Sequence, residues 1–391
     1  MIRYIISLLL LMTCRLVSGA QNIDEILLQI EANNKTIQAE SQQLQAADTE
    51  IRIQNNLEDP AIEYSPFFAK NEKGIVSSEL VVRQGFDFPT LYFMRRKSGD
   101  AQRMALQKKY EGVRREVLLE AKNLCLDMIR LNQEAELLDA RKKGAEHLLK
   151  IYVQRLEEGD ATRIEVNKIK MERMNVQTEV AQNVAAHRAA LQQLLALNGN
   201  MPLNFAEKEY PEVEETGSYD MLYDEIVSTD AALQEANANA SAAMGEITVN
   251  RHQWLPKLEL AYRRNTSFSE SNNGFLIGGS IPLFSNRKKV KIAKFKASSA
   301  QLQLDNLRLQ IEAEVQSKYN EMVQLREALE VYDVELMKAT LALLDEAVES
   351  GEMSLTEYYV EADNVYKNYQ SYVNLNYQYQ RLLSEIYKNR L

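Results

Sequence analysis

The sequence predicts a mainly α-helical protein with a small β part, built from one structural unit that occurs twice. Three observations predict this fold class. First, the 391 residues include only 14 Gly and 7 Pro, whereas about 7% Gly and 5% Pro are usual, so turns are few and helices are long. Second, landmark residues recur in the same order at a nearly constant offset. Third, short segments before each long helical stretch alternate apolar and polar residues, which is typical of strands.

The N-terminal segment has the pattern of a secretory signal peptide. Arg3 precedes an apolar run over residues 4–12, and the small residues Ser18, Gly19 and Ala20 follow. This order predicts cleavage after Ala20. A second interpretation is a lipoprotein signal acylated at Cys14, although the preceding Thr is a poor match to the usual small residue. No other segment is continuously apolar, so we expect no membrane-spanning helix in the mature chain.

Two halves of the mature chain share the same landmarks, which predicts a first repeat over residues 21–200, a linker over 201–217 and a second repeat over 218–391. Four pairs of landmarks support the duplication. They are Arg95-Arg96-Lys97 with Arg287-Lys288-Lys289 and Gly159 with Gly351 (both 192 apart), Pro89 with Pro282 (193 apart), and Pro60 with Pro256 (196 apart).

Each repeat is predicted to contain a polar helix, two strands, a very long helix, a Gly turn and a return helix. In the first half we expect a helix over 23–57, strands over 61–68 and 75–88, and a long helix over 95–158. In the second half we expect a helix over 219–251, strands over 257–264 and 274–284, and a long helix over 287–350.

The predicted strands have one apolar and one polar face. Leu80, Val82 and Phe86 alternate with Glu79 and Arg83, which fits either a small sheet on a core or a membrane β-barrel strand. Four strands cannot close a barrel, since about eight is the smallest usual number. A barrel therefore requires an oligomer, and three copies would supply twelve strands and a ring of helices.

The second return helix carries a packing stripe of coiled-coil spacing. The stripe consists of Leu355, Tyr358, Ala362, Val365, Tyr369, Tyr372, Asn376, Tyr379, Leu382 and Ile386. We interpret it as a helix-packing surface and not as a ligand site. Cys125, the only thiol left after cleavage, lies among apolar neighbours and is expected to pack in the interior.

Composition and motifs exclude several functions. A net charge of −10 disfavours nucleic-acid binding, because phosphate binding needs a basic surface. The three histidines, His147, His187 and His252, are scattered, and neither a nucleophile elbow nor a phosphate-binding Gly loop is present. We therefore expect no enzymatic activity, cofactor or metal.

This layout resembles the TolC-type outer membrane efflux family over essentially the whole mature chain. The local strings that resemble the family are Val82–Pro89 and its second copy Gly279–Phe284, Leu195–Gly199 at the end of the first half, and the turns Gly159–Thr162 and Gly351–Tyr358. The resemblance rests on their order and spacing, since no string is diagnostic alone.

The resemblance implies a homotrimer in the outer membrane, with a 12-stranded barrel that continues into a periplasmic α-helical coiled-coil tunnel. It implies a passive exit duct of a tripartite pump, joined through a periplasmic adaptor to an inner-membrane transporter. The compact halves favour RND-type drug or heavy-metal efflux. The alternatives are a duct for type I protein secretion with an ABC transporter, or a periplasmic coiled-coil adaptor or scaffold without a pore.

Candidate site residues follow from this resemblance. The tips at Gly159, Asp160, Gly351 and Glu352 are where the family meets its adaptor, although the glycines also simply end a helix. Glu357 occupies a position where some members have an acidic gate residue. The match is partial, because Val360 replaces the second acid and Glu361 lies beside it. Three copies of Glu357 around one axis would favour cations, whereas a solvated outer-face charge is the alternative.

The two basic runs directly follow the last strand of each half. In a trimer, Arg95, Arg96, Lys97, Arg287, Lys288 and Lys289 would lie where the barrel becomes the tunnel. We expect this belt to attract anionic outer-membrane lipid, at about 1 kcal/mol per charge near such a surface. Tyr92 and Phe93 fit an aromatic girdle at the same level.

Overall fold

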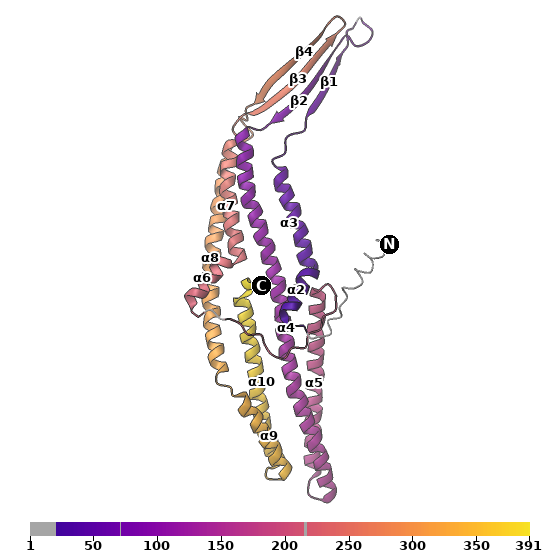
Figure 1. Ribbon diagram of the computed structural model, residues 1–391, viewed down its shortest axis with the longest axis vertical. Coiled ribbons are helices and arrows are strands. Elements are labelled where there is room, and N and C mark those ends of the chain that lie inside the picture. Colours follow the sequence, from indigo (N-terminus) through magenta and orange to yellow (C-terminus); the bar gives the residue numbers. More distant parts are fainter. Residues whose placement is uncertain (1–20, 71, 215–216) are drawn as a thin grey trace, which may run out of the picture. The chain divides into compact units, whose positions relative to one another are not determined.

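The computed structural model describes residues 21–70, 72–214 and 217–391, and confirms a mostly helical chain with one small sheet (Figure 1). The predicted signal peptide, its cleavage site and Cys14 lie outside the described residues. In chain order the described elements are α2 (Ile23–Asn33), α3 (Lys35–Ile53), β1 (Ala61–Phe67), β2 (Ser77–Phe86), α4 (Pro89–Glu158), α5 (Arg163–Leu197), α6 (Tyr219–Thr229), α7 (Ala231–His252), β3 (Lys257–Ser267), β4 (Ser271–Ser280), α8 (Lys289–Leu329), α9 (Val334–Ser350), α10 (Leu355–Ile386) and the 3₁₀ turn η1 (Lys388–Arg390).

The chain forms two compact units, and each unit takes segments from both halves of the sequence. The first unit comprises residues 21–38, 114–222 and 315–391, and holds α2, α5, α9 and α10 with parts of α4 and α8. The second comprises Ala39–Val113 and Tyr223–Glu314, and holds the sheet, α7, most of α3 and the remaining parts of α4 and α8. Residues that are distant in the sequence thus form each unit together.

The opening helix of each repeat is divided in two, which corrects the single helices predicted over 23–57 and 219–251. The side chain of Asn34 accepts a hydrogen bond from the Ile37 N–H at 3.0 Å and so caps α3. The side chain of Asp230 accepts one from the Leu233 N–H at 2.9 Å and caps α7. An Asx side chain competes with the helix for backbone donors, so the two copies are interrupted at equivalent positions.

The two long helices differ. α4 is continuous over 70 residues, as predicted, although it begins at Pro89, the usual place for a first-turn proline. The prediction of an equally long second helix was wrong, because α8 ends at Leu329 and α9 starts at Val334. The Asp333 side chain accepts a hydrogen bond from the Leu336 N–H at 2.9 Å and caps α9. Residues 330–333 contain no Pro or Gly, so the sequence gives no usual signal for this break.

The four strands form one antiparallel sheet in the order β1-β2-β3-β4. The hairpin of each repeat therefore lies next to the other hairpin, joined by the β2–β3 ladder from Ser77↔Ser267 to Phe86↔Leu258. Predicted strand positions are confirmed with shifted ends. β2 stops at Phe86 instead of residue 88, and β4 covers 271–280 instead of 274–284.

In the first unit, the predicted stripe of α10 is confirmed as a packing surface. Six of its members are buried: Leu355, Tyr358, Ala362, Tyr379, Leu382 and Ile386. Cys125 is buried as expected and is the free cysteine of the described residues. Burial raises the pKa of its thiol to about 12, so it is not a reactive thiolate.

Part of the segment between the repeats is bound to α4. The Asn132 and Gln133 side chains each donate to it, reaching the carbonyl oxygens of Glu207 and Lys208 at 2.7 Å, and Phe205 is buried. Within the described ranges, none of the helices combines the length and apolar character needed to cross a membrane.

Candidate functional site

One face of the sheet is apolar and exposed. Directly paired residues of antiparallel strands share a face, and the pairs Ile62↔Val82, Val82↔Tyr262 and Tyr262↔Phe275 form one apolar row across all four strands. Ile62 is 70% exposed, Phe275 88% and Ile277 83%. We call this surface the apolar sheet face. It consists of Ile62, Tyr64, Leu80, Val82, Phe86, Leu258, Leu260, Tyr262, Phe275 and Ile277.

The opposite face is largely polar and carries charge pairs. Arg263 donates to Glu79 at 2.8 Å between β3 and β2, and Arg83 pairs with Glu63 between β2 and β1. The alternation predicted from the sequence is therefore confirmed. Six of the ten side chains of the apolar face stay exposed, and the other four are partly buried, namely Leu80, Val82, Phe86 and Tyr262. This disfavours a sheet that lies on a core of its own.

The sheet also has two unpaired edges, β1 and β4. Each edge presents backbone N–H and C=O groups that no other described strand meets. Open edges are sites for pairing with another chain, and they are not tolerated against lipid.

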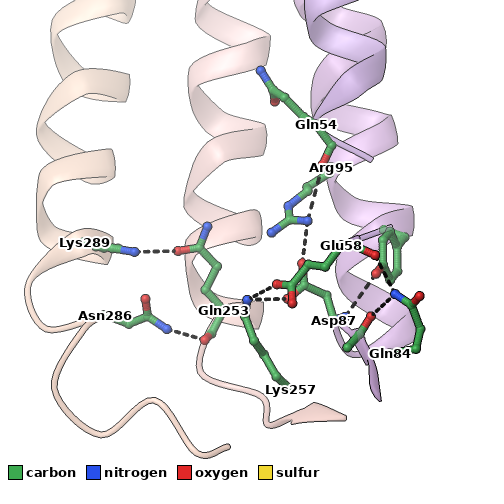
Figure 2. A network of polar contacts seen from close by, with 11 residues as sticks. Gln54, Glu58, Gln84, Asp87, Arg95, Gln253, Lys257, Asn286 and Lys289 are labelled. Carbon is green, nitrogen blue, oxygen red and sulfur yellow. Dashed lines mark hydrogen bonds and ion pairs between the residues drawn. The ribbon is translucent and has the colours of Figure 1, made fainter. Parts of the chain in front are cut away.

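A polar network fixes the base of the sheet to the helices of its own unit (Figure 2). Asp87, which follows β2, accepts from Arg95 of α4 at 2.7 Å and lies 3.8 Å from the ammonium of Lys257 in β3. Lys257 also pairs with Glu58, which precedes β1. We call Glu58, Asp87, Arg95 and Lys257 the collar. Three of the four strands are thus held at one end by alternating charges.

The six residues of the predicted basic belt differ in their contacts, and one of them belongs to the collar. Arg95 is committed to the collar, and it also donates to the Gln54 carbonyl at 3.4 Å. Lys289 donates to the Gln253 side chain at 3.3 Å (Figure 2). The other four belt residues, Arg96, Lys97, Arg287 and Lys288, are exposed. Tyr92 accepts from the Asp87 N–H at 3.0 Å and Phe93 is exposed.

At the far ends of the hairpins, the predicted tips are turns of matching chemistry. Gly159 and Gly351 both have left-handed backbones, with φ of 90° and 81°, which is the conformation that favours glycine at a helix end. The next helix starts in each case with a capping box, formed by Thr162 with Glu165 and by Ser354 with Glu357. Asp160 and Glu352 are exposed in these turns.

The gate candidate Glu357 therefore has a local role that the sequence did not reveal. The carboxylate of Glu357 accepts from the Ser354 N–H at 3.1 Å, and hydrogen bonds from Ser354 lower its pKa. Glu361, one helical turn later, is also exposed. Glu357 and Glu361 share a helix face because they are four residues apart.

Both hairpins meet in one core close to the tips, within the first unit. Tyr152 of α4 and Ile169 of α5 pack with Val348 of α9 and Tyr358 of α10 in this cluster. Two polar contacts add to it: Arg155 donates to the Glu349 carbonyl at 2.6 Å, and Lys168 donates to the Thr356 hydroxyl at 2.8 Å.

A tyrosine–carboxyl pair inside the second hairpin was missed by sequence analysis. The Tyr358 hydroxyl donates to Asp345 at 2.8 Å between α10 and α9. Burial raises the pKa of Asp345, against the opposing effect of this hydrogen bond. The signal that could have found it is a carboxyl on the inner side of α9, in line with the buried Leu344 and Val348.

Comparisons with known proteins agree with this fold. The sequence model of the outer membrane efflux protein family matches residues 222–388. The chain carries an outer membrane efflux protein domain. The resemblance to the TolC-type family is thereby confirmed. No curated protein sequence matches the chain significantly.

Solved structures of outer-membrane channels share the fold of this chain. The chain is similar to the outer-membrane channel OprN, with 13% identity over 94% of this chain and 89% of that one and a TM-score of 0.75. It is similar to VceC of Vibrio cholerae, with 15% identity over 94% and 95% and a TM-score of 0.71. It is also similar to CmeC of Campylobacter jejuni, with 14% identity over 94% and 85% and a TM-score of 0.69.

The described residues of the chain contain no cluster of three metal-ligating side chains. The features that the structure brings together are instead surfaces: an apolar sheet face with open edges, a charged collar at its base, and paired helical tips.

Proposed function

We propose that this protein is the outer-membrane channel of a tripartite efflux system. Three copies join their sheets into a 12-stranded barrel, and their helices form a periplasmic tunnel. The channel passively conducts substrates that an inner-membrane transporter exports through a periplasmic adaptor. Drug or heavy-metal efflux of the RND type is the proposed substrate class.

The exposed apolar sheet face with two open edges carries this proposal. A bilayer would cover the apolar side chains, at about 25 cal/mol per Å² of apolar surface removed from water. Closure of the sheets would pair the backbone groups of β1 and β4, which lipid cannot satisfy. The charged opposite face would then line an aqueous lumen, the usual arrangement of a membrane barrel.

Covalent capture of the closed barrel tests this proposal. Ser65 of β1 and Asn272 of β4 lie on the same face and in the same row, through the pairs Ser65↔Glu79, Glu79↔Asn265 and Asn265↔Asn272. A flexible thiol cross-linker applied to outer membranes that carry the S65C/N272C variant should give a ladder of bands ending at the trimer. A ladder that continues beyond three, or monomers in a soluble fraction, would refute the proposal.

Two controls make this experiment specific. Either single-cysteine variant cannot link successive copies through β1 and β4 into a ring, so neither should form a covalent trimer. The native Cys125 is buried with a raised pKa, so it should stay unlabelled, and a C125S background removes it altogether.

The tips and the acidic pair complete the proposal. The turns at Gly159, Asp160, Gly351 and Glu352 dock the adaptor, while Glu357 and Glu361 narrow the periplasmic mouth. The rival use, type I protein secretion, predicts an ABC transporter encoded beside this gene instead of an RND transporter. Loss of resistance to drugs or metals on deletion supports efflux, and loss of a secreted protein supports secretion.

A further inference from the structure

We propose that the junction between β4 and α8 is a binding site for the headgroups of anionic phospholipid, and that its counterpart in the first repeat is not. We call residues 281–296 the basic junction. The inference rests on the proposed function, because it requires the sheet to lie in a bilayer.

The charged side chains of the basic junction are all positive. No Asp or Glu occurs between Glu270 and Asp305, although the chain has 56 acidic residues. Five cations of the junction are exposed, namely Arg287, Lys288, Lys291, Lys294 and Lys296. None of these five forms an ion pair with another described residue. Such a cluster attracts anionic headgroups at about 1 kcal/mol per charge near the surface.

Apolar side chains stand directly before the cations. Ile281, Leu283 and Phe284 are 67%, 63% and 84% exposed, and they follow the end of β4 in the chain. The order from apolar to cationic side chains along the chain matches the passage from acyl chains to headgroups. A free phosphate ion would use the cations but would leave these apolar residues in water, so we assign the site to a lipid.

The backbone that carries the cations is held in place. The buried Asn286 donates from its side chain to the carbonyl of Gln253 at the end of α7, and Lys289 reaches the Gln253 side chain (Figure 2). Lys288 adopts a left-handed backbone with φ of 69°, which few L-residues favour. Arg287 and Lys288 are therefore presented on a fixed turn.

The first repeat uses the same position differently. Its basic run is flanked by Asp87 and Asp100, and Arg95 is bound to Asp87 in the collar. Leu91 is buried and the helix already begins at Pro89, so no apolar loop precedes the cations. The first copy stabilises the base of the sheet, and the second copy remains available to lipid.

The single tryptophan provides the test. Trp254 follows Gln253, the residue that holds the junction, and is 43% exposed. The full chain is reconstituted in nanodiscs of phosphatidylcholine that contain a minor fraction of phosphatidylglycerol, with brominated acyl chains on one lipid or the other. Quenching of Trp254 fluorescence then reports which lipid lies beside the junction.

We expect brominated phosphatidylglycerol to quench Trp254 more strongly at equal mole fraction. In the R287Q/K288Q variant the relative binding constant should fall by about fivefold for each charge removed, corresponding to about 1 kcal/mol per cation. The matched R96Q/K97Q variant, which removes two exposed cations from the first copy, should keep the wild-type preference.

Three outcomes would overturn the inference. Equal quenching by both lipids means that the junction selects no headgroup, as when a neighbouring protomer covers it. A preference that survives R287Q/K288Q, or that falls equally in R96Q/K97Q, removes the assignment to the second copy. Quenching by neither lipid means that the junction does not meet the bilayer, which contradicts the proposed function itself.

Discussion

The two repeats have the same kinds of helix caps, but they differ in whether the long helix between those caps is continuous. Both interrupt the opening helix with an Asx cap, Asn34 or Asp230, and both start the return helix with a capping box after a left-handed glycine. Between these points, the first copy has one continuous helix of 70 residues. The second has two helices of 41 and 17 residues.

The comparison separates what the duplicated architecture requires from what each copy can vary. Turns need particular residues, since only a few side chains cap a helix or tolerate a positive φ. Helix interiors accept many sequences, so the copies are free to diverge there. Asp345 and Tyr358 pair in the second tip hairpin, whereas the positions 192 residues earlier are Val153 and Val166.

The largest expected effect is the loss of stability when an Asx cap is removed, and it should differ between the two repeats. Asn34 caps α3 and also donates to the Leu197 carbonyl at 2.9 Å, whereas the side chain of Asp230 acts as a cap. We expect Asn34→Ala to lower the free energy of unfolding by about 2–4 kcal/mol, as cap loss and an unsatisfied, partly buried carbonyl combine. Asp230→Ala should cost about 1 kcal/mol.

Thermal unfolding of the detergent-solubilised variants measures this difference. Asn34→Asp keeps the cap and loses the donor, so it should fall between wild type and Asn34→Ala. Equal losses for Asn34→Ala and Asp230→Ala would show that the second hydrogen bond of Asn34 contributes nothing.

A smaller effect, dependent on pH, should occur in the second tip alone. The raised pKa of Asp345 means that the folded state prefers the protonated carboxyl. Its contribution to stability is therefore greatest at pH values below the ordinary pKa, and is lost as pH rises through the raised value. Asp345→Asn keeps an acceptor for Tyr358 without the buried charge, so it should raise the apparent Tm at neutral pH.

The same substitution should have little effect below the ordinary carboxyl pKa of about 3.9, where the wild-type carboxyl is protonated. Val153→Asn, at the equivalent position of the first copy, is the control and should show no pH-dependent gain. A Tm difference that stays constant across this range would contradict a titrating Asp345.

We expect the smallest effect on stability when either capping-box glutamate is replaced by Gln, at about 0.5 kcal/mol or less. Glu357→Gln and Glu165→Gln both keep an oxygen that can accept from the cap backbone. Only Glu357→Gln combined with Glu361→Gln should lower the cation preference of the channel in planar bilayers. An unchanged selectivity would remove the gate proposal, and the same change in Glu165→Gln would attribute it to general surface charge.

Sequence reasoning found the features that depend on local patterns. The strands follow from period-two alternation at Leu80 and Val82, and the tips from Gly159 and Gly351. It missed the break after Leu329, because the Asp333 cap resembles any surface acid until its Leu336 partner is known. It also treated both basic runs alike. Only tertiary contacts, such as Arg95 with Asp87, distinguish a committed cation from an available one.

The strand order has a consequence for how the chain folds. Each hairpin is local, but the central β2–β3 ladder joins Phe86 to Leu258, residues that lie in different halves of the chain. Non-local pairing of this kind slows folding, since a long loop must close before any contact compensates its entropy. The sheet can be completed only when the chain is available as far as Ser280, well into its second half. Until then the first hairpin exposes its apolar face and an unpaired edge, and open edges of this kind promote aggregation.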